Sequence, residues 1–177
     1  MSANIDTELH GMVKGIVDDL EAAVAGSLYK VDGEHKVIDD VDGWKKERFE
    51  EMCDVFRQNH DPKDMDASAY DTYEDWMHDE IGLDGPDDVE EPDEVSLSEY
   101  LEEASLGDIR FEVDSDLDMQ GGKTLFAYGG PNIWVADDEV RGYWGSSKVE
   151  MSLDSETGGE LYSWFEEMWQ NAKERNR

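Results

Sequence analysis

Cysteine is almost absent from this chain of 177 residues, because Cys53 is the only one. An intramolecular disulfide is therefore excluded, and so is a cysteine-rich metal site. Cys53 falls within an apolar helical pattern, which favours a buried structural thiol over a reactive one.

Long hydrophobic runs are also missing. No apolar stretch approaches the roughly 20 residues needed to cross a bilayer. The N-terminal sequence from Met1 to Asp6 lacks the basic start and apolar core of a signal peptide. These two absences predict a cytoplasmic protein without a membrane-spanning segment.

Basic residues are scarce: 15 Lys and Arg stand against 47 Asp and Glu, and the net charge is -32. Between Lys63 and Arg110 there is no basic residue at all, while 18 acidic ones occur. Self-repulsion of this size makes a compact state costly. A strongly basic partner, a high-salt environment or a bound cation should compensate for it.

The size of the charge allows a comparison with nucleic acid. Duplex DNA carries one charge per roughly 1.7 Å, so the net charge equals that of about 16 base pairs over roughly 54 Å. A compact domain of this length has a radius of gyration of roughly 16 Å, so an elongated monomer or a homodimer would match a duplex better. Direct binding to nucleic acid is disfavoured, because phosphate contacts need Lys and Arg.

The composition nevertheless predicts a folded chain. Apolar residues make up 38%, with six Trp, seven Tyr and five Phe, which is too aromatic for an acidic disordered tail. Apolar side chains recur at helical spacing over about residues 5–27, 43–59 and 68–81. Residues 28–38, with Asp32-Gly33 at their centre, form a small hairpin or a loop.

Residues 82–95 contain two prolines and seven acids without apolar periodicity, which is typical of a linker or exposed loop. We therefore expect a mainly helical region at 1–81, an acidic linker at 82–95 and an α+β region at 96–177. The last begins with a short helix, because Ser96 and Glu99 have the spacing of a capping box.

After Gly107 the apolar period changes from helical to alternating. Five short strands are predicted at 109–113, 124–128, 133–135, 140–144 and 148–153, separated by turns at Gly121-Gly122, Gly129-Gly130-Pro131, Asp137-Asp138 and Gly145–Ser147. Leu161, Trp164 and Phe165 lie on the apolar face of a final helix. The fold class is thus α+β, with N-terminal helices and a C-terminal antiparallel meander covered by that helix.

The motifs that resemble sites for catalysis or cofactor binding each lack required residues. Gly122-Lys123-Thr124 resembles the end of a phosphate-binding loop, but Leu117 stands where the motif needs glycine. Asp114-Ser-Asp116-Leu-Asp118 resembles a calcium loop, but Met119 and Leu125 replace the required Gly and Glu. The four histidines have no paired metal-ligand spacing, and no Gly-flanked nucleophilic serine is present. We expect no cofactor, no metal and no enzymatic activity.

Trp134 and Trp144 lie on predicted strands whose other face is open, so one of them is a candidate anchor for a partner. The alternative is that both tryptophans are ordinary core residues.

In charge, size and lack of a catalytic signature, the chain resembles the acidic antirestriction and anti-CRISPR proteins that phages and mobile elements use as DNA mimics. The stretches Tyr128–Val135, Gly142–Ser146 and Trp164–Trp169 are similar in style to small phage proteins. The resemblance implies stoichiometric inhibition of a DNA-reading complex, with carboxylates in its basic groove.

Our hypothesis is therefore an inhibitor that occupies the DNA channel of a restriction or CRISPR complex. Two rivals remain: an acidic adaptor or halophile-adapted domain whose charge serves solubility, and a metal-dependent enzyme with clustered carboxylates. The candidate partner-binding carboxylates lie in the third helix, in the linker and in the Asp-rich stretch after it: Asp71, Glu74, Asp75, Asp79, Glu80, Asp84, Asp87, Asp88, Glu90, Glu91, Asp93, Glu94, Asp114, Asp116 and Asp118.

Overall fold

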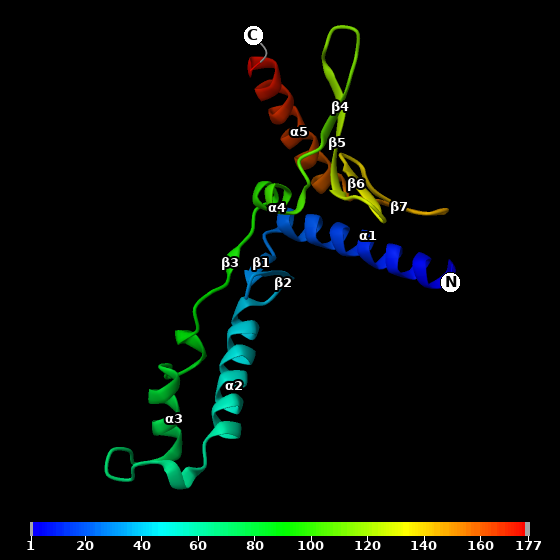
Figure 1. The fold of residues 1–177 in the computed structure, drawn as a ribbon. Helices are drawn as coiled ribbons and strands as arrows, with labels where there is room; N and C mark the ends of the chain where they lie inside the picture. Colours follow the sequence, from blue (N-terminus) through cyan, green and yellow to red (C-terminus); the bar gives the residue numbers. More distant parts are fainter. Residues whose placement is uncertain (1, 176–177) are drawn as a thin grey trace. The chain divides into compact units, whose positions relative to one another are not determined.

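The computed structural model describes residues 2–175, with the side chains of 4–175, and divides into two compact units (Figure 1). The sheet unit combines the residues up to Val37 with those from Glu94 onward. The inserted unit comprises Ile38–Asp93. This division differs from the expected boundaries after residues 81 and 95, because the first helix shares a core with the C-terminal sheet.

The sheet unit is built on a five-stranded antiparallel sheet in the order β4-β5-β6-β7-β8, which confirms the predicted meander and the α+β fold class. Its strands are β4 (Ile109–Val113), β5 (Met119–Ala127), β6 (Asn132–Ala136), β7 (Glu139–Trp144) and β8 (Ser147–Ser152). Each strand follows its neighbour in sequence, so short turns join all five.

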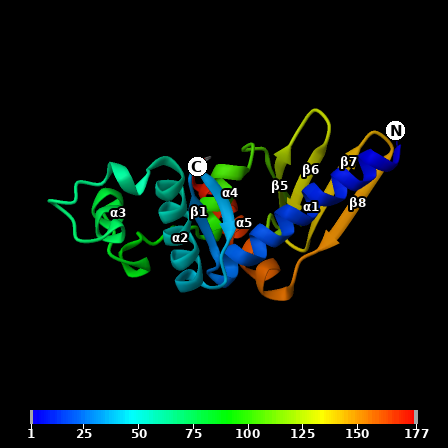
Figure 2. The ribbon, with the colours of Figure 1, turned by 90° about the horizontal axis from the view of Figure 1, so that it is seen from below.

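Alternation places the apolar side chains on one face of this sheet. Ile133 and Val135 of β6 and Val140 of β7 are fully buried, and Val135 pairs with Val140. The helix α1 (Ser2–Ala25) contacts β7 and β8, and α5 (Ser155–Arg175) contacts β5 (Figure 2). The predicted cover by the final helix is confirmed, and α1 is a second covering helix.

Two glycines allow these helices to approach the sheet closely. A Cβ at Gly142 would lie 2.7 Å from a methyl carbon of Val13 and 2.8 Å from one of Leu9, both on α1. A Cβ at Gly122 would lie 2.4 Å from the ring of Phe165 on α5. Such distances are far below van der Waals contact, so the missing side chains create the space for the helices.

The expected turn at Gly121-Gly122 is therefore wrong. Both residues lie inside β5, which begins at Met119, and Asp114–Asp118 form the turn before it. Asp114 accepts hydrogen bonds from the amides of Asp116 and Asp118 at 2.9 and 3.0 Å, so its carboxylate closes that turn. Glycine pairs indicate turns in general, but here Gly122 allows the close approach of Phe165 on α5.

A second, three-stranded sheet lies in the order β2-β1-β3. Strands β1 (Leu28–Val31) and β2 (Glu34–Val37) form an antiparallel hairpin, so the hairpin interpretation of residues 28–38 is correct and the loop is not. Asp32 and Gly33 have φ angles of 53° and 85°, as a type I′ turn requires. The third strand is β3 (Asp93–Glu94).

Helix α4 (Leu97–Ala104) begins at the predicted capping box. The amide of Glu99 donates to the hydroxyl of Ser96 at 3.3 Å, and the amide of Ser96 donates to the carboxylate of Glu99 at 2.9 Å. Tyr100 and Leu101 of this helix are buried in the same core as α1 and α5.

The inserted unit has its own small core. It contains α2 (Val41–Asn59), η1 (Pro62–Asp64), α3 (Tyr73–Ile81) and η2 (Pro86–Asp88). Cys53 and Phe56 of α2 pack with Trp76 and Met77 of α3, and the rings of Phe56 and Trp76 meet edge to face at 5.1 Å. Cys53 is 3% exposed, which confirms the prediction of a buried thiol.

Two local predictions in the inserted unit need correction. Helix α3 begins at Tyr73 rather than at residue 68, because Asp66 accepts a hydrogen bond from the amide of Ser68 in a separate turn. Residues 82–93 belong to the inserted unit and are not a separate linker, and the boundary to the sheet unit follows Asp93. They contain η2 and the buried Val89, and Lys45 of α2 donates to the carbonyl of Asp87 at 3.2 Å. A lack of periodicity did not mean a lack of contacts.

Candidate functional site

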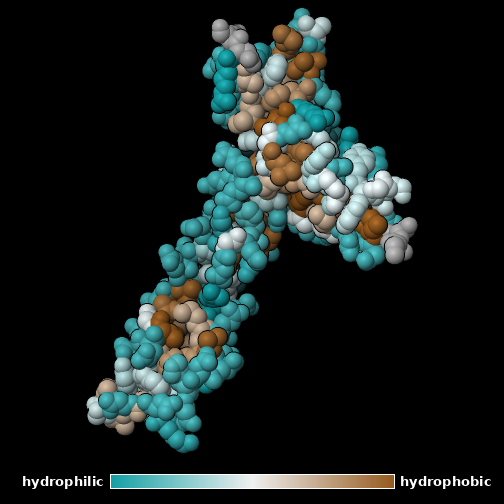
Figure 3. Space-filling view, viewed as in Figure 1, coloured by the Kyte–Doolittle hydropathy of each residue, from teal (hydrophilic) through white to brown (hydrophobic). Residues whose placement is uncertain are grey.

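Negative charge is concentrated on the inserted unit. Its 56 residues carry 21 acidic and 5 basic side chains, a net charge of -16 and so half of the total on less than a third of the chain. Every one of these 21 acidic residues is exposed. In Figure 3 the surface over α2 and α3 is mainly hydrophilic, with one apolar patch.

The five candidates around α3 differ in what they contact. Asp75 accepts from the amide of Thr72 at 3.1 Å as part of the N-terminal cap of the helix. Asp79 accepts from the hydroxyl of Tyr70, and this hydrogen bond raises the pKa of that tyrosine. Glu80 accepts from the indole of Trp76 at 3.3 Å. Exposed neighbours at 71 and 74 complete the group.

The candidates between residues 84 and 94 lie mostly in the inserted unit as well. Asp88 accepts from the amides of Asp84 and Gly85 at 2.9 and 3.2 Å, which organises the segment before η2. Glu91 pairs with Lys45 at 3.8 Å. Asp87, Glu90 and Asp93 are exposed, whereas Glu94 belongs to the sheet unit.

The Asp-rich stretch belongs to the sheet unit and not to the inserted unit. Asp114, Asp116 and Asp118 form the turn between β4 and β5 in the sheet unit. Asp114 also accepts from the side-chain amide of Gln120 at 3.1 Å. Its carboxylate oxygens thus stabilise the turn. Of the fifteen candidates, eleven lie in the inserted unit.

Sequence reasoning missed the carboxylates of α2 and of the residues before it. Lys45, Lys46 and Arg48 interrupt these acids in the sequence, whereas the stretch between Lys63 and Arg110 contains no base. In the structure Arg48 pairs with Glu51 at 3.5 Å and Arg57 pairs with Asp54 at 2.8 Å. Each base offsets one carboxylate, and 21 acidic against 5 basic residues leave the unit strongly negative. The overlooked exposed acids are Asp39, Asp40, Asp42, Glu47, Glu50, Glu51 and Asp54.

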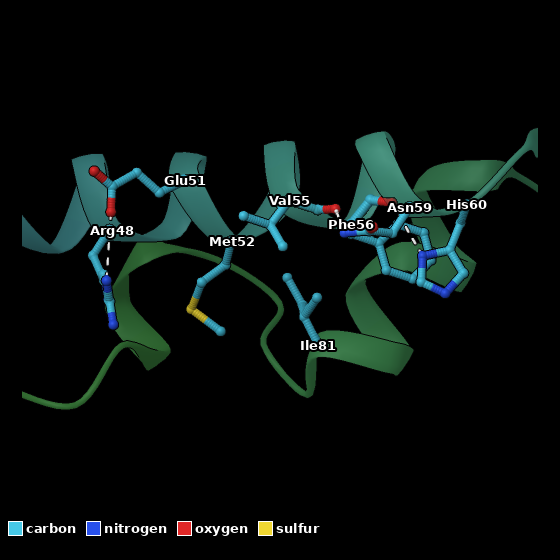
Figure 4. A pocket seen from close by; sticks show the side chains of 8 residues that line it. All are labelled: Arg48, Glu51, Met52, Val55, Phe56, Asn59, His60 and Ile81. Carbon is cyan, nitrogen blue, oxygen red and sulfur yellow. Dashed lines mark hydrogen bonds and ion pairs between the residues drawn. The ribbon is translucent and has the colours of Figure 1, made fainter.

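An apolar groove lies between α2 and α3 in the middle of this acidic surface. Met52, Val55 and Phe56 of α2 face Ile81 at the end of α3 around a cavity of about 410 Å³ (Figure 4). Val55 is 58% exposed, so its side chain is accessible to solvent. His60 stacks on Phe56 at 4.2 Å and closes one end of the groove.

The two tryptophans proposed as anchors lie on different faces of the large sheet. Trp144 packs against the main core. Trp134 lies on the opposite face, where the guanidinium of Arg110 stacks over its ring at 4.5 Å and the ammonium of Lys123 lies at 5.7 Å. Arg141 and Lys148 lie on the same face of the sheet, where both pair with Glu150.

Among the side chains that the structure describes, no three or more His, Cys, Asp or Glu residues converge so as to hold a metal ion. Within residues 2–175, no helix combines the length and the apolar character that a bilayer crossing requires.

Comparisons with known proteins add no relative: neither a scan against protein-family models nor searches of curated proteins and of solved structures find a match.

Proposed function

We propose that the chain is a non-enzymatic, DNA-mimicking inhibitor that blocks the DNA-binding groove of a bacterial defence complex, of the restriction or CRISPR type. The observation that carries the proposal is the exposure of all 21 carboxylates on the 56-residue inserted unit, at a net charge of -16. Carboxylates held on ordered helices can replace phosphates opposite Lys and Arg. The inhibitor would act in the cytoplasm of the cell that contains the complex.

The physical expectation is fast, salt-sensitive association. A concentrated field of one sign steers an oppositely charged groove toward itself and loses its effect as salt screens it. Single carboxylates should contribute little, because exposed ion pairs are individually weak. The inhibition should thus depend on several carboxylates together.

The test measures DNA cleavage by a panel of purified restriction endonucleases and RNA-guided nucleases, with and without the protein. We expect stoichiometric inhibition of at least one complex at low salt and its relief by excess duplex DNA. If none is inhibited, or if the inhibition ignores competing duplex, the proposal is wrong.

Charge reversal locates the contact. Changing Asp84, Asp87 and Glu90 of the inserted unit to Lys should reduce inhibition at least about tenfold, because three attractive contacts become repulsive. The matched control reverses Glu160, Glu166 and Glu167, three exposed acids of α5, which alters the net charge equally. Equal losses in both variants would mean that only the total charge matters.

A further inference from the structure

The apolar groove between α2 and α3 has the features of a docking site. Most of its lining comes from α2, Ile81 of α3 lies opposite, and its volume of about 410 Å³ is enough for several side chains. Figure 4 shows Met52 and Val55 pointing from α2 toward Ile81 of α3. Scattered exposed apolar residues are ordinary on protein surfaces, whereas apolar residues that line one concave surface indicate a binding region.

Charge around the groove restricts what could fill it. Glu51 lies in its lining, and the helices that form it carry nine exposed carboxylates: Asp42, Glu47, Glu50, Glu51, Asp54, Glu74, Asp75, Asp79 and Glu80. Arg48 in the lining is paired with Glu51. An anionic or purely apolar segment would gain less here than a cationic one.

We propose that this groove binds the apolar face of a Lys/Arg-rich amphipathic helix that belongs to the partner protein. Apolar side chains at helical spacing would contact Val55, Met52 and Ile81, and the basic face of the same helix would lie opposite the carboxylates of α2 and α3. Such a mode places an amphipathic helix between two others, as in known helix-in-groove complexes. The inference rests on the proposed function only in requiring a basic partner.

The groove also supplies apolar contacts, which a purely charged surface lacks. Attraction between exposed charges is screened by salt, so it accelerates association more than it prolongs the complex. A few apolar side chains in a desolvated pocket typically dominate the affinity of an interface. Binding should therefore have a salt-resistant part that depends on the groove and a salt-sensitive part that does not.

The test uses the full-length protein and two fluorescent peptides of about 18 residues, or five helical turns. Both contain the same Lys and Leu residues. In one peptide the Leu residues follow helical spacing, and in the other their order is scrambled. Dissociation constants are measured by fluorescence anisotropy at low and at high NaCl concentration.

The wild-type protein should bind the amphipathic peptide at least about tenfold more tightly than the scrambled one, also at high salt. Val55→Gln and, separately, Met52→Gln should abolish this preference while leaving the scrambled peptide's affinity unchanged. Leu106→Gln is the matched control, because Leu106 in the sheet unit is also 58% exposed. It should keep the full preference.

The outcomes separate the two proposals. Equal affinity for both peptides would contradict the proposal that the groove binds an amphipathic helix. The proposal that the acidic surface contacts the partner would be unaffected. A preference that survives both groove variants would place the apolar contact elsewhere and would also contradict the proposed binding in the groove. If neither peptide binds at low salt, the charge attraction that the proposed function assumes fails together with the groove.

Discussion

Single residues determine how closely the helices of the sheet unit approach the sheet. Gly121 and Gly122 are neighbours in β5, yet their surroundings differ completely. A Cβ at Gly121 would lie 3.5 Å from the carboxylate of Asp137, an ordinary contact, whereas one at Gly122 would overlap the ring of Phe165. Phe165 is fully buried in the core, so it has little room to move.

We predict that Gly122→Ala destabilises the protein by about 1–3 kcal/mol, because the added methyl group overpacks a filled core. Urea unfolding followed by fluorescence gives the free energy of unfolding. Gly121→Ala is the control and should change it by less than about 0.5 kcal/mol. Equal effects of the two substitutions would show that the cost comes from strand backbone and not from Phe165.

At the same scale, the carboxylates of the acidic surface are not equivalent. Asp75 and Asp88 accept backbone hydrogen bonds, whereas Asp87 and Glu90 serve no such purpose in the structure. Reversing the charge of the first two would disturb local structure as well as the field. For this reason the charge-reversal variant avoids them.

At the scale of elements, helix starts are set by side chains just before them. Thr72 and Asp75 form a reciprocal capping box at α3, in which the amide of Asp75 donates to the Thr72 hydroxyl at 3.1 Å. The box explains why α3 begins at Tyr73 although apolar spacing extends back to Tyr70. Caps satisfy the amides that a helix leaves unpaired, so they decide its first residue.

Removal of this cap should loosen the inserted unit. We predict that Thr72→Ala costs about 1 kcal/mol, with faster hydrogen exchange in α3 and unchanged exchange in β5–β7, measured by mass spectrometry. Thr72→Ser keeps the hydroxyl and should retain most of the protection. Should the Ser variant exchange as fast as the Ala variant, the hydroxyl would not be the stabilising group.

For the whole molecule, charge and packing oppose each other. The inserted unit buries a small cluster around Cys53, Phe56, Trp76 and Met77, while 21 exposed carboxylates repel one another around it. Screening lengths fall from about 30 Å at 0.01 M to about 3 Å at 1 M salt, so added salt relieves this repulsion. Stability should thus depend on salt more than is usual.

We predict that the protein remains folded at about 0.01 M NaCl and that its melting temperature rises by several degrees at about 1 M, followed by circular dichroism. The halophile alternative expects an unfolded chain at the lower concentration. Unfolding there would favour that alternative, and a melting temperature independent of salt would show that the repulsion is already compensated within the fold.

Local features of the fold were predictable, because they depend on residues close together in the sequence. The capping box at Ser96 and the five alternating strands belong to this class, whereas Asp32-Gly33 left a hairpin and a loop open. The predictions from sequence were wrong where a segment distant in the sequence packs on the residues concerned. Gly122 pairs with Phe111 inside a strand and contacts Phe165 of the distant α5, and residues 82–93 contact α2.

Part of the candidate site was predictable in the same way. Eleven candidate carboxylates between 71 and 93 do share the inserted unit, since they are continuous in sequence. The acids of α2 were missed because their contribution appears only once α2 and α3 pack together. The apolar groove was not visible at all, because Val55 and Ile81 lie 26 positions apart and on different helices.

The amino-acid sequence by itself determined the net charge, the absence of an internal disulfide, the α+β class and the order of most helices and strands, since each follows from composition or short-range spacing. Only the tertiary structure decided that α1 joins the C-terminal sheet, that residues 38–93 form a separate acidic unit, and that this unit has an apolar groove. The physical reason is that an amphipathic pattern specifies which face is buried but not which segment buries it.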